Sequence, residues 1–503
     1  MDKILVLDFG SQYSHLICRR IREFSVYAEL VPFDISYEEI QKHNPKGIIF
    51  SGGPSSVYSS EAPVPENKIF EMDLPLLGIC YGHQLIVDKF GGKVKRANKE
   101  YGSSLLTIDN DSDLLNGIGE SVRAWMSHGD EAEEIPSGFK IIGHTEGAKA
   151  AAIASDEKSV YGIQFHPEVV HTEQGTEILK NFVLKVCKAK QEWTMEGFID
   201  SAVEKISKIE GNVLCGVSGG IDSTVVALLI DKAIGNRLKC VFVNNGLLRL
   251  NEEKEVEEMF KDNFKVNFTS VDAGNQFLEK LKGVEDPERK RKIVGEEFIR
   301  VFTNFAEKEG PFKWLAQGTL YPDVIESGVS KGPADVIKSH HNVGGLPDWL
   351  NLEILEPLRE LYKDEVRQIA KILGVPEKLF MRHPFPGPGL SVRIMGEITE
   401  TKLQISKIAS KIVEEELMES GFYTKVWQAY AAVGDDKAVG VVGDIQRSPW
   451  REPCPAGQPQ WASTRRSLSM RGEPGHEAGL DLRRAKRAMR AKRGMLGAKR
   501  RGS

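Results

Sequence analysis

The chain has 503 residues, of which 41% are hydrophobic and 28% are charged, and its formal net charge is −5. A chain of this length is expected to form about three domains, each with a core of its own. No apolar run approaches the length needed to cross a bilayer, which excludes a protein built on membrane-spanning helices. The six cysteines lie far apart without metal-ligand spacing, and the N-terminus is typical of a strand rather than a leader, so we expect a cytoplasmic protein.

The first 54 residues alternate short β-branched runs with amphipathic stretches. KILVLDF, ELVPF and KGIIFSGGP are typical of strands, whereas HLICRRIREF and ISYEEIQKH have helical spacing. This alternation predicts an open, mostly parallel sheet covered by helices.

Cys80 follows a predicted strand and precedes a predicted helix in PLLGICYGHQLIVDKFGG. Its small neighbours permit the strained turn of a nucleophile elbow, and the helix N-terminus favours the thiolate. In YGIQFHPEVV, His166 follows another strand and is placed to deprotonate the thiol, while Glu168 orients the imidazole. Taken singly, the three residues have ordinary alternatives: a buried structural cysteine, a loop histidine and a solvated carboxylate.

GICYGHQ and QFHPE together resemble the class I glutamine amidotransferases, and SGGP at residues 51–54 is similar to the oxyanion loop of that family. The resemblance implies that Cys80 attacks the side-chain amide of glutamine and forms a thioester while ammonia leaves.

The same resemblance implies further contacts around the thiol. The backbone N–H groups of Gly53 and Tyr81 would face the oxyanion, and Gln84 would contact glutamine. The strings YGSS at 101–104 and SHGD at 127–130 match family positions that line the glutamine pocket. Such clusters are also typical of surface turns, which is the alternative interpretation.

A second motif, SGGIDS at residues 218–223, separates an apolar run from the helical pattern STVVALLI. Successive glycines let backbone N–H groups turn toward one point, and the helix adds its unpaired N-terminal donors and its dipole. The pattern predicts a phosphate-binding loop in which Asp222 is placed to hold Mg²⁺. No Walker lysine follows, which excludes an ordinary loop for γ-phosphate transfer; a glycine-rich turn without a ligand is the alternative.

The loop resembles that of the ATP pyrophosphatases, which hold the β- and γ-phosphates as a leaving group. The residues predicted to bind ATP or pyrophosphate are Ser218, Gly219, Gly220, Ile221, Asp222 and Ser223. From Met1 to about Asp444 the chain is similar to the glutamine-hydrolysing GMP synthetases, through strings such as VFVNNGLLR, LAQGTLYPDVIES, IKSHHNVGGLP and RHPFPGPGL. NAD synthetase, a weaker alternative, does not explain the last two strings.

Membership of that family would imply a two-step reaction with Mg²⁺ and with ATP as co-substrate. Xanthosine 5′-monophosphate attacks ATP, pyrophosphate leaves, and ammonia from glutamine displaces AMP to give GMP. Val243 would contact adenine through its backbone, and Asn244 stands where the family usually has aspartate. His340 and His341 would orient substrate or order a loop, because no carboxylate or cysteine lies at ligand spacing beside them.

Several cations are carried over as candidates to face phosphates or substrate. They are Arg249, Lys290, Arg291, Lys292 and Lys363. A solvated helix face is the alternative role for each.

The predicted fold class is α/β, with two open, mostly parallel sheet domains and an incomplete small α/β domain. Residues 1–190 would form the class I amidotransferase domain, and residues 191–386 an ATP pyrophosphatase domain like the adenine-nucleotide α-hydrolases. PFPGPG would form a rigid connector to residues 387–444, the start of the family's dimerisation domain.

Residues 445–503 differ from the rest in composition and resemble no part of the family. They contain 15 Lys and Arg but 4 Asp and Glu, a net charge of +11 that leaves −16 for the rest of the chain. With no Val, Phe or Tyr, this tail is expected to be disordered apart from a basic helix near 480–493.

The family's C-terminal Lys-Pro-Pro motif is missing from this tail, which puts the synthetase step and the family's homodimer in doubt. Two alternatives to the full enzyme therefore stay open. One is a glutaminase that is impaired in synthesis, and the other is a nucleic-acid-binding protein that uses the basic tail.

Overall fold

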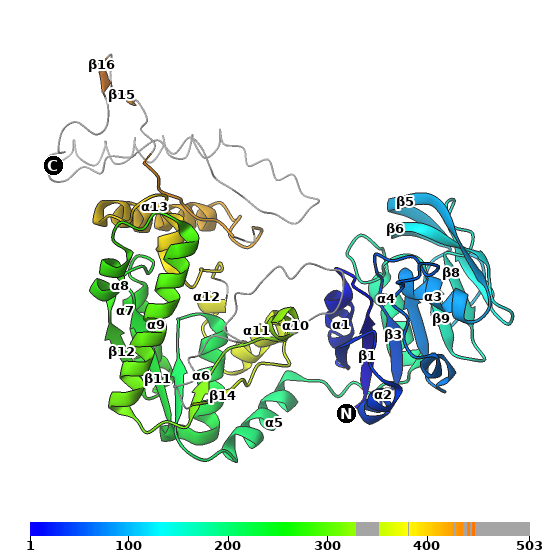
Figure 1. Cartoon of the computed structure of the whole chain (residues 1–503), viewed down its shortest axis with the longest axis horizontal. Helices are drawn as coiled ribbons and strands as arrows, with labels where there is room; N and C mark the ends of the chain where they lie inside the picture. Colours follow the sequence, from blue (N-terminus) through cyan, green and yellow to red (C-terminus); the bar gives the residue numbers. More distant parts are fainter. Residues whose placement is uncertain (328–351, 381, 427, 436–439, 443–444, 448–503) are drawn as a thin grey trace. The chain divides into compact units, whose positions relative to one another are not determined.

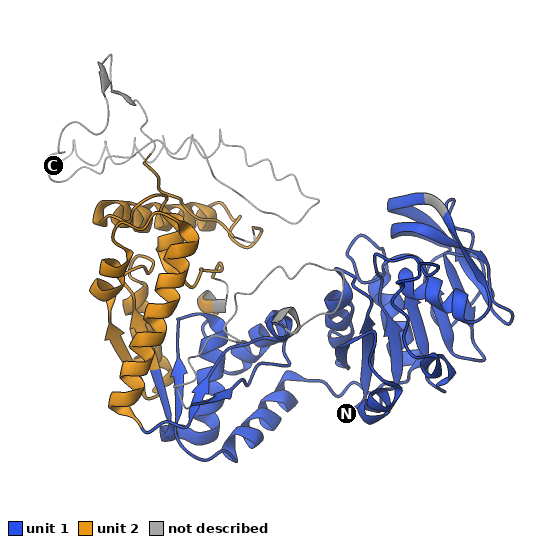
Figure 2. Ribbon diagram, in the orientation of Figure 1, with its two compact units in different colours: residues 1–240, 311–376 blue, residues 241–310, 377–503 orange. Residues whose placement is uncertain are grey.

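The computed structural model describes residues 1–327, 352–380, 382–426, 428–435, 440–442 and 445–447. By internal contacts the chain divides into two compact units (Figure 2). Unit 1 contains residues 1–240 and 311–376, and unit 2 contains residues 241–310 and those from 377 onward. His340 and His341 lie outside the described residues, as does the tail from residue 448. No helix of the described part is long and apolar enough to cross a bilayer.

Unit 1 begins with a nine-stranded sheet whose first five strands are parallel, in the order β2-β1-β3-β4-β9 (Figure 1). Their bounds are β1 Lys3–Asp8, β2 Tyr27–Pro32, β3 Gly47–Phe50, β4 Leu76–Ile79 and β9 Val160–Ile163. Four antiparallel strands extend this sheet beyond β9 in the order β8-β7-β5-β6. Their bounds are β5 Lys93–Ile108, β6 Ser121–Glu134, β7 Lys140–His144 and β8 Ala152–Ser155.

Strand β1 shows why the parallel part of this sheet is stable. Ile4 and Val6 lie in one buried cluster and Leu5 and Leu7 in another, because successive side chains of a strand point to opposite faces. Both faces are therefore covered, as expected of a parallel sheet whose strands are nearly continuous hydrophobic runs.

The helices of this region follow the predicted amphipathic stretches. They are α1 Ser14–Arg22, α2 Tyr37–His43, α3 Tyr81–Lys89 and α4 Gly175–Lys180. Helix α2 begins with a capping box between Ser36 and Glu39 and ends at Asn44 in the left-handed conformation. The three strands and two helices predicted in the first 54 residues are confirmed, each within a few residues of the predicted bounds.

A second sheet has the order β12-β11-β10-β13-β14. Its strands are β10 Val213–Gly216, β11 Leu238–Asn244, β12 Phe268–Asp272, β13 Trp314–Ala316 and β14 Glu353–Leu355. Strand β11 contains the boundary between the units, which falls after Cys240. The helices of this part of unit 1 are α5 Met195–Ser207, α6 Ile221–Ile234, α10 Tyr321–Ser327 and α11 Lys363–Ile372.

Most of the regular structure of unit 2 is helical. Its helices are α7 Glu252–Glu258, α8 Gly274–Leu281, α9 Pro287–Glu309, α12 Glu377–Phe380 and α13 Glu400–Glu419. Helix α9 starts after the cap Asp286 with proline at its first turn, and α13 starts after the cap Thr399. PFPGPG has no regular structure before a 3₁₀ turn at Gly389–Arg393, as its composition predicts. A short antiparallel pair, β15 Gly440–Val442 and β16 Ile445–Arg447, lies near the end of the described chain.

Candidate active sites

The first candidate site lies at the carboxyl ends of three neighbouring parallel strands of unit 1. Gly53 follows β3, Cys80 follows β4, and His166 follows β9. Because β3, β4 and β9 are adjacent and parallel, their carboxyl ends meet at one edge of the sheet. Strand order thus brings together residues that are far apart in the sequence.

Cys80 has the strained backbone that a nucleophile elbow requires. Its φ of 53° and ψ of −103° lie outside the regions that most side chains favour. A Cβ at Gly78 would lie 2.3 Å from the carbonyl oxygen of Gly82, and one at Gly82 would lie 2.5 Å from that of Phe50. The two glycines are therefore needed for the tight approach of α3 to β4 at Gly78 and to the end of β3 at Gly82.

His166 is held by a buried carboxylate. Its Nδ1 lies 2.8 Å from Oε1 of Glu168, and the side chains are 4% and 0% exposed. Burial by itself lowers the pKa of His166, but the charge of Glu168 and the hydrogen bonds to Cys80 and Glu168 outweigh it and raise the pKa well above its ordinary value. Glu168 therefore favours the protonated form of the imidazole when His166 accepts a proton beside Cys80.

Two glutamines, Gln84 and Gln164, lie near the thiol, and the sequence predicted a role only for Gln84. Nε2 of Gln164 donates to Sγ of Cys80 at 3.7 Å, and the Cys80 thiol donates to the carbonyl oxygen of Ser127 at 3.5 Å. Nε2 of Gln84 donates to the carbonyl oxygen of Asp130 at 2.9 Å and to Oε1 of Gln164 at 3.3 Å. Gln84 thus orders the pocket wall. The sequence feature that could have identified Gln164 is its position two residues before His166.

A pocket with a volume of about 770 Å³ opens beside Cys80. Its lining includes the predicted Gly53, Tyr81, Gln84, Tyr101 and residues 127–130. Tyr81 is the first residue of α3, so its N–H has no acceptor within the helix.

The same pocket has polar groups that sequence reasoning did not find. Asp130 accepts hydrogen bonds from the hydroxyls of Ser56 at 2.5 Å and Tyr58 at 2.7 Å. Arg96 and Lys99 add exposed cations to the lining. An amino-acid ligand could therefore meet cations as well as the thiol.

The second candidate site is the loop before α6. Gly219 has a φ of +72°, which favours glycine, and the loop is held by its own serines. Oγ of Ser223 accepts from the backbone N–H of Ser218 at 3.1 Å, and Oγ of Ser218 accepts from that of Gly220 at 3.3 Å. The first-turn N–H groups of α6 have no intrahelical acceptor, so the loop offers several donors to an anion.

Asp222 joins this loop to helix α11. Its Oδ2 forms an ion pair with Nζ of Lys363, and its Oδ1 is buried without a hydrogen-bond partner. Mg²⁺ usually binds one or two carboxylates together with phosphate oxygens and water. The unpartnered oxygen therefore fits a Mg²⁺ ligand, although the described residues contain no group of three metal-ligating side chains.

The first turn of α11 also contacts helix α1. Nη1 of Arg22 lies 3.0 Å from Oε2 of Glu365, and Nε1 of Trp193 donates to Oε1 of Glu365 at 2.6 Å. The guanidinium of Arg22 also lies 4.6 Å to 5.4 Å from the ring centres of Tyr27, Tyr362, Tyr321 and Trp193. The side chains of Arg22 and Glu365 are 2% and 7% exposed. Sequence reasoning missed this buried pair, since neither residue stands in a motif.

The remaining predicted cations have different surroundings in unit 2. Lys290 is fully buried, and its ammonium donates to the carbonyl oxygens of Gly396, Ile394 and Ser391 at 2.6, 2.7 and 3.4 Å. All three of its donors are thus occupied, which leaves none for a phosphate.

The other residues discussed in unit 2 differ in their burial and in their partners. Arg291 forms an ion pair with Glu288 at 3.2 Å, and Lys292 is exposed. Val243 is buried in β11. Oδ1 of Asn244 accepts from the backbone N–H of Gly246 at 2.9 Å, so this residue stabilises the turn after the strand.

Two family models match parts of this chain. Residues 5–186 match the model of the class I glutamine amidotransferase family, and residues 193–297 match that of the NAD synthase family. The chain is 52% identical to a glutamine-hydrolysing GMP synthase of Brachyspira hyodysenteriae, with 88% of this chain and 87% of that protein covered. It is 54% identical to one of Caldicellulosiruptor saccharolyticus, with the same coverage. With both domain types present and half of its residues shared over this length, the chain belongs to the family of glutamine-hydrolysing GMP synthases.

Proposed function

We propose that this chain makes GMP from xanthosine 5′-monophosphate, using ATP and the amide nitrogen of glutamine. Its family membership supports this reaction over both alternatives, the impaired synthetase and the nucleic-acid-binding protein. The observation that carries the proposal is the presence in one chain of the Cys80 site and of the loop at residues 218–223.

The first half-reaction is the hydrolysis of glutamine at Cys80. Neutral His166 takes the proton of the Cys80 thiol, the thiolate attacks the amide carbon, and the N–H groups of Gly53 and Tyr81 receive the developing oxyanion. The protonated His166 then gives its proton to the nitrogen, so ammonia leaves and a thioester remains. Water, deprotonated by the neutral imidazole, cleaves the thioester to glutamate and restores the thiol. Glu168 keeps the imidazole oriented through both proton transfers.

The second half-reaction uses the loop at residues 218–223. Its backbone N–H groups and serine hydroxyls would hold the β- and γ-phosphates of ATP as an oxygen of xanthosine 5′-monophosphate attacks the α-phosphorus. Pyrophosphate leaves with the bonding electron pair, and ammonia then displaces AMP from the purine carbon. Mg²⁺ held by Asp222 would neutralise charge on the phosphates. Lys363 forms an ion pair with Asp222, so its ammonium would lie close to the phosphates as well.

Two further properties belong to this proposal. The five cysteines of the described residues are all free, which supports a reducing, cytoplasmic location. The family's homodimer is the other property, and the mass of the purified chain in solution tests it.

The decisive experiment measures GMP formation by the full chain with either glutamine or ammonium chloride as the nitrogen source. Cys80→Ala is expected to abolish the reaction with glutamine and to retain the reaction with ammonia. Cys187→Ala, which removes another buried thiol, is the matched control and should retain both. Equal loss of both reactions in Cys80→Ala would contradict the division into two half-reactions. Glutamine hydrolysis without GMP from either nitrogen source would identify the impaired synthetase instead.

A further inference from the structure

His128, on strand β6, is a buried histidine to which the proposed reaction assigns no role. Its side chain is 1% exposed, although the residue belongs to the lining of the pocket beside Cys80. Nε2 lies 3.1 Å from Oε2 of Glu100, its direct cross-strand neighbour on β5. Nδ1 lies 3.1 Å from the carbonyl oxygen of Asp130. The ring therefore joins a carboxylate of one strand to a backbone carbonyl group of the next.

Both neighbours of this imidazole are hydrogen-bond acceptors. A carbonyl oxygen cannot donate, and an ionised carboxylate cannot donate either. Both contacts are hydrogen bonds only when each ring nitrogen carries a proton, so the geometry favours the imidazolium form of His128. His83, a second buried histidine, does not compete for the carboxylate of Glu100, because burial lowers the pKa of His83 to about 3, with a further lowering by the charge of His128.

Glu100 is held in place by neutral donors as well. Its Oε1 accepts from Oγ of Ser104 at 2.6 Å, and the hydroxyl of Thr145 lies 3.3 and 3.4 Å from its two carboxylate oxygens. A Cβ at Gly147 would lie 2.7 Å from Oε2, so the backbone approaches this carboxylate closely. Glu100 thus presents its charge to His128 from a fixed position.

The carbonyl group that His128 contacts belongs to the wall of the pocket. The carbonyl oxygen of Asp130 also accepts from Nε2 of Gln84 at 2.9 Å, and that of Ser127 accepts from the thiol of Cys80 at 3.5 Å. Because His128 lies between these two residues of β6, a displacement of its ring would disturb both carbonyl groups.

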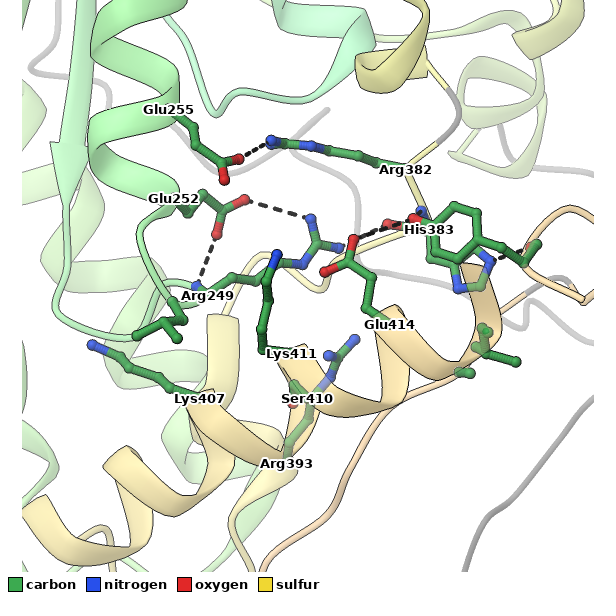
Figure 3. Close-up of a pocket in the computed structure, with 14 residues that line it drawn as sticks. Arg249, Glu252, Glu255, Arg382, His383, Arg393, Lys407, Ser410, Lys411 and Glu414 are labelled. Carbon is green, nitrogen blue, oxygen red and sulfur yellow. Dashed lines mark hydrogen bonds and ion pairs between the residues drawn. The ribbon is translucent and has the colours of Figure 1, made fainter. Parts of the chain in front are cut away.

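A cation is held in the same way in unit 2. Nη1 of Arg249 lies 3.5 Å from Oε1 of Glu252, and its Nη2 donates to the carbonyl oxygen of His383 at 2.8 Å (Figure 3). In both places a cation joins a carboxylate to a backbone carbonyl group, and such charge-assisted hydrogen bonds are stronger than neutral ones. A histidine, unlike an arginine, can lose its charge, so the arrangement at His128 depends on the carboxylate of Glu100.

We propose that Glu100 and His128 form a positioning pair for glutamine, which fixes the pocket wall at residues 127–130 in the arrangement that binds the substrate. Both ring nitrogens of His128 are occupied, and Glu100 lies outside the lining of the pocket, so neither side chain takes part in the chemical steps. This inference rests on the proposed hydrolysis of glutamine at Cys80 and adds the residues that set the affinity for glutamine. The pair acts on the KM for glutamine rather than on kcat.

The test measures glutamine hydrolysis by the full chain and, in parallel, GMP formation with ammonium chloride. His128→Gln and Glu100→Gln should each raise the KM for glutamine by about 10–100-fold, as the loss of one hydrogen bond to a charged group implies, with kcat nearly unchanged. The reaction with ammonia should stay at the wild-type level, which reports that the variants fold. His144→Gln is the matched control and should keep the wild-type KM, because His144 and Asp109 form an exposed pair of the same kind at 2.8 Å.

Two further variants separate an ion pair from two unrelated structural roles. The double variant His128→Gln with Glu100→Gln should raise the KM no more than either single change, because each residue acts through the other. Glu100→Asp keeps the charge and should raise the KM less than Glu100→Gln does.

Several results would overturn the inference and leave the proposed function intact. They are additive effects of the two single changes, equal effects of Glu100→Asp and Glu100→Gln, a fall in kcat at an unchanged KM, and an unchanged KM in both single variants. Wild type that hydrolyses no glutamine would instead contradict the proposed function, and this inference with it.

Discussion

The candidate site at Cys80 and the predicted cations of unit 2 differ in what positions their side chains. Cys80, Gly53 and His166 each follow a strand, and the order β3-β4-β9 makes them neighbours. Lys290, by contrast, stands in a run of cations on α9, and only its own tertiary contacts separate it from Lys292. A position fixed by the backbone can be predicted from the chain order, whereas the role of a long charged side chain depends on its partners.

The largest expected effect is that of Glu168→Gln, which attacks the strand-positioned site. The glutamine keeps the shape but removes the charge that raises the pKa of His166, so the protonated imidazole is lost at lower pH. We expect glutamine hydrolysis to fall by about 10²–10⁴-fold, the usual range for a disturbed general acid–base pair. Initial rates against pH should show the basic limb of the profile displaced to lower pH.

The stability of this pair has a defined pH dependence. Because the folded pKa of His166 is raised, the pair contributes fully below the unfolded value of about 6.5, and its contribution is lost as pH rises through the folded pKa. The difference in stability between wild type and Glu168→Gln should therefore disappear at high pH. Glu173→Gln, at an exposed glutamate of the same loop, is the control for the rate and the profile. An unchanged basic limb in Glu168→Gln would contradict the assignment.

The sequence predicted the strand-positioned features well. The alternating runs before residue 54 and the elbow at Cys80 follow from local pattern, because small residues and β-branched residues restrict the backbone directly. Gln164, Ser56 and Tyr58 were missed, since their positions depend on contacts across the pocket. The pairing of Arg22 with Glu365 was missed for the same reason, as 343 residues separate them in sequence.

The next effect concerns that buried pair between α1 and α11. Arg22→Met leaves the carboxylate of Glu365 buried without its cation, which costs about 3–5 kcal/mol in comparable cases. Urea unfolding of the full chain should show the loss in its first transition. The double variant Arg22→Met with Glu365→Gln should recover part of it, because no uncompensated charge then remains.

The chain offers a matched control in the same pair of helices. Arg19 and Asp364 form an ion pair at 3.2 Å, with side chains 47% and 26% exposed. Arg19→Met should cost at most about 1 kcal/mol, as for solvent-exposed pairs. If both arginines had equal effects, burial would not explain the difference between the two pairs.

Asp222→Ala tests whether the loop at residues 218–223 acts on phosphate. Loss of the proposed Mg²⁺ ligand and of the partner of Lys363 should slow pyrophosphate release by about 10²–10³-fold, which corresponds to several kcal/mol of charge stabilisation. The assay uses saturating ammonia, so that the Cys80 site plays no part. Asp231→Ala, near the other end of α6, should retain the rate. A normal rate in Asp222→Ala would show that the residue only favours the start of the helix.

The smallest effect separates two lysines that look alike in the sequence. Lys290→Met leaves three backbone carbonyl groups without their common donor, and we expect a loss of about 1–3 kcal/mol in stability. Lys292 is exposed, so Lys292→Met should change stability by less than about 0.5 kcal/mol. If Lys292 faces phosphate as predicted, its variant should instead raise the KM for ATP or for xanthosine 5′-monophosphate. Both variants are measured by urea unfolding, for stability, and by steady-state kinetics, for nucleotide binding. The opposite pattern, with Lys290→Met stable but impaired in nucleotide binding, would mean that the buried ammonium exchanges its carbonyl partners for a phosphate during the reaction.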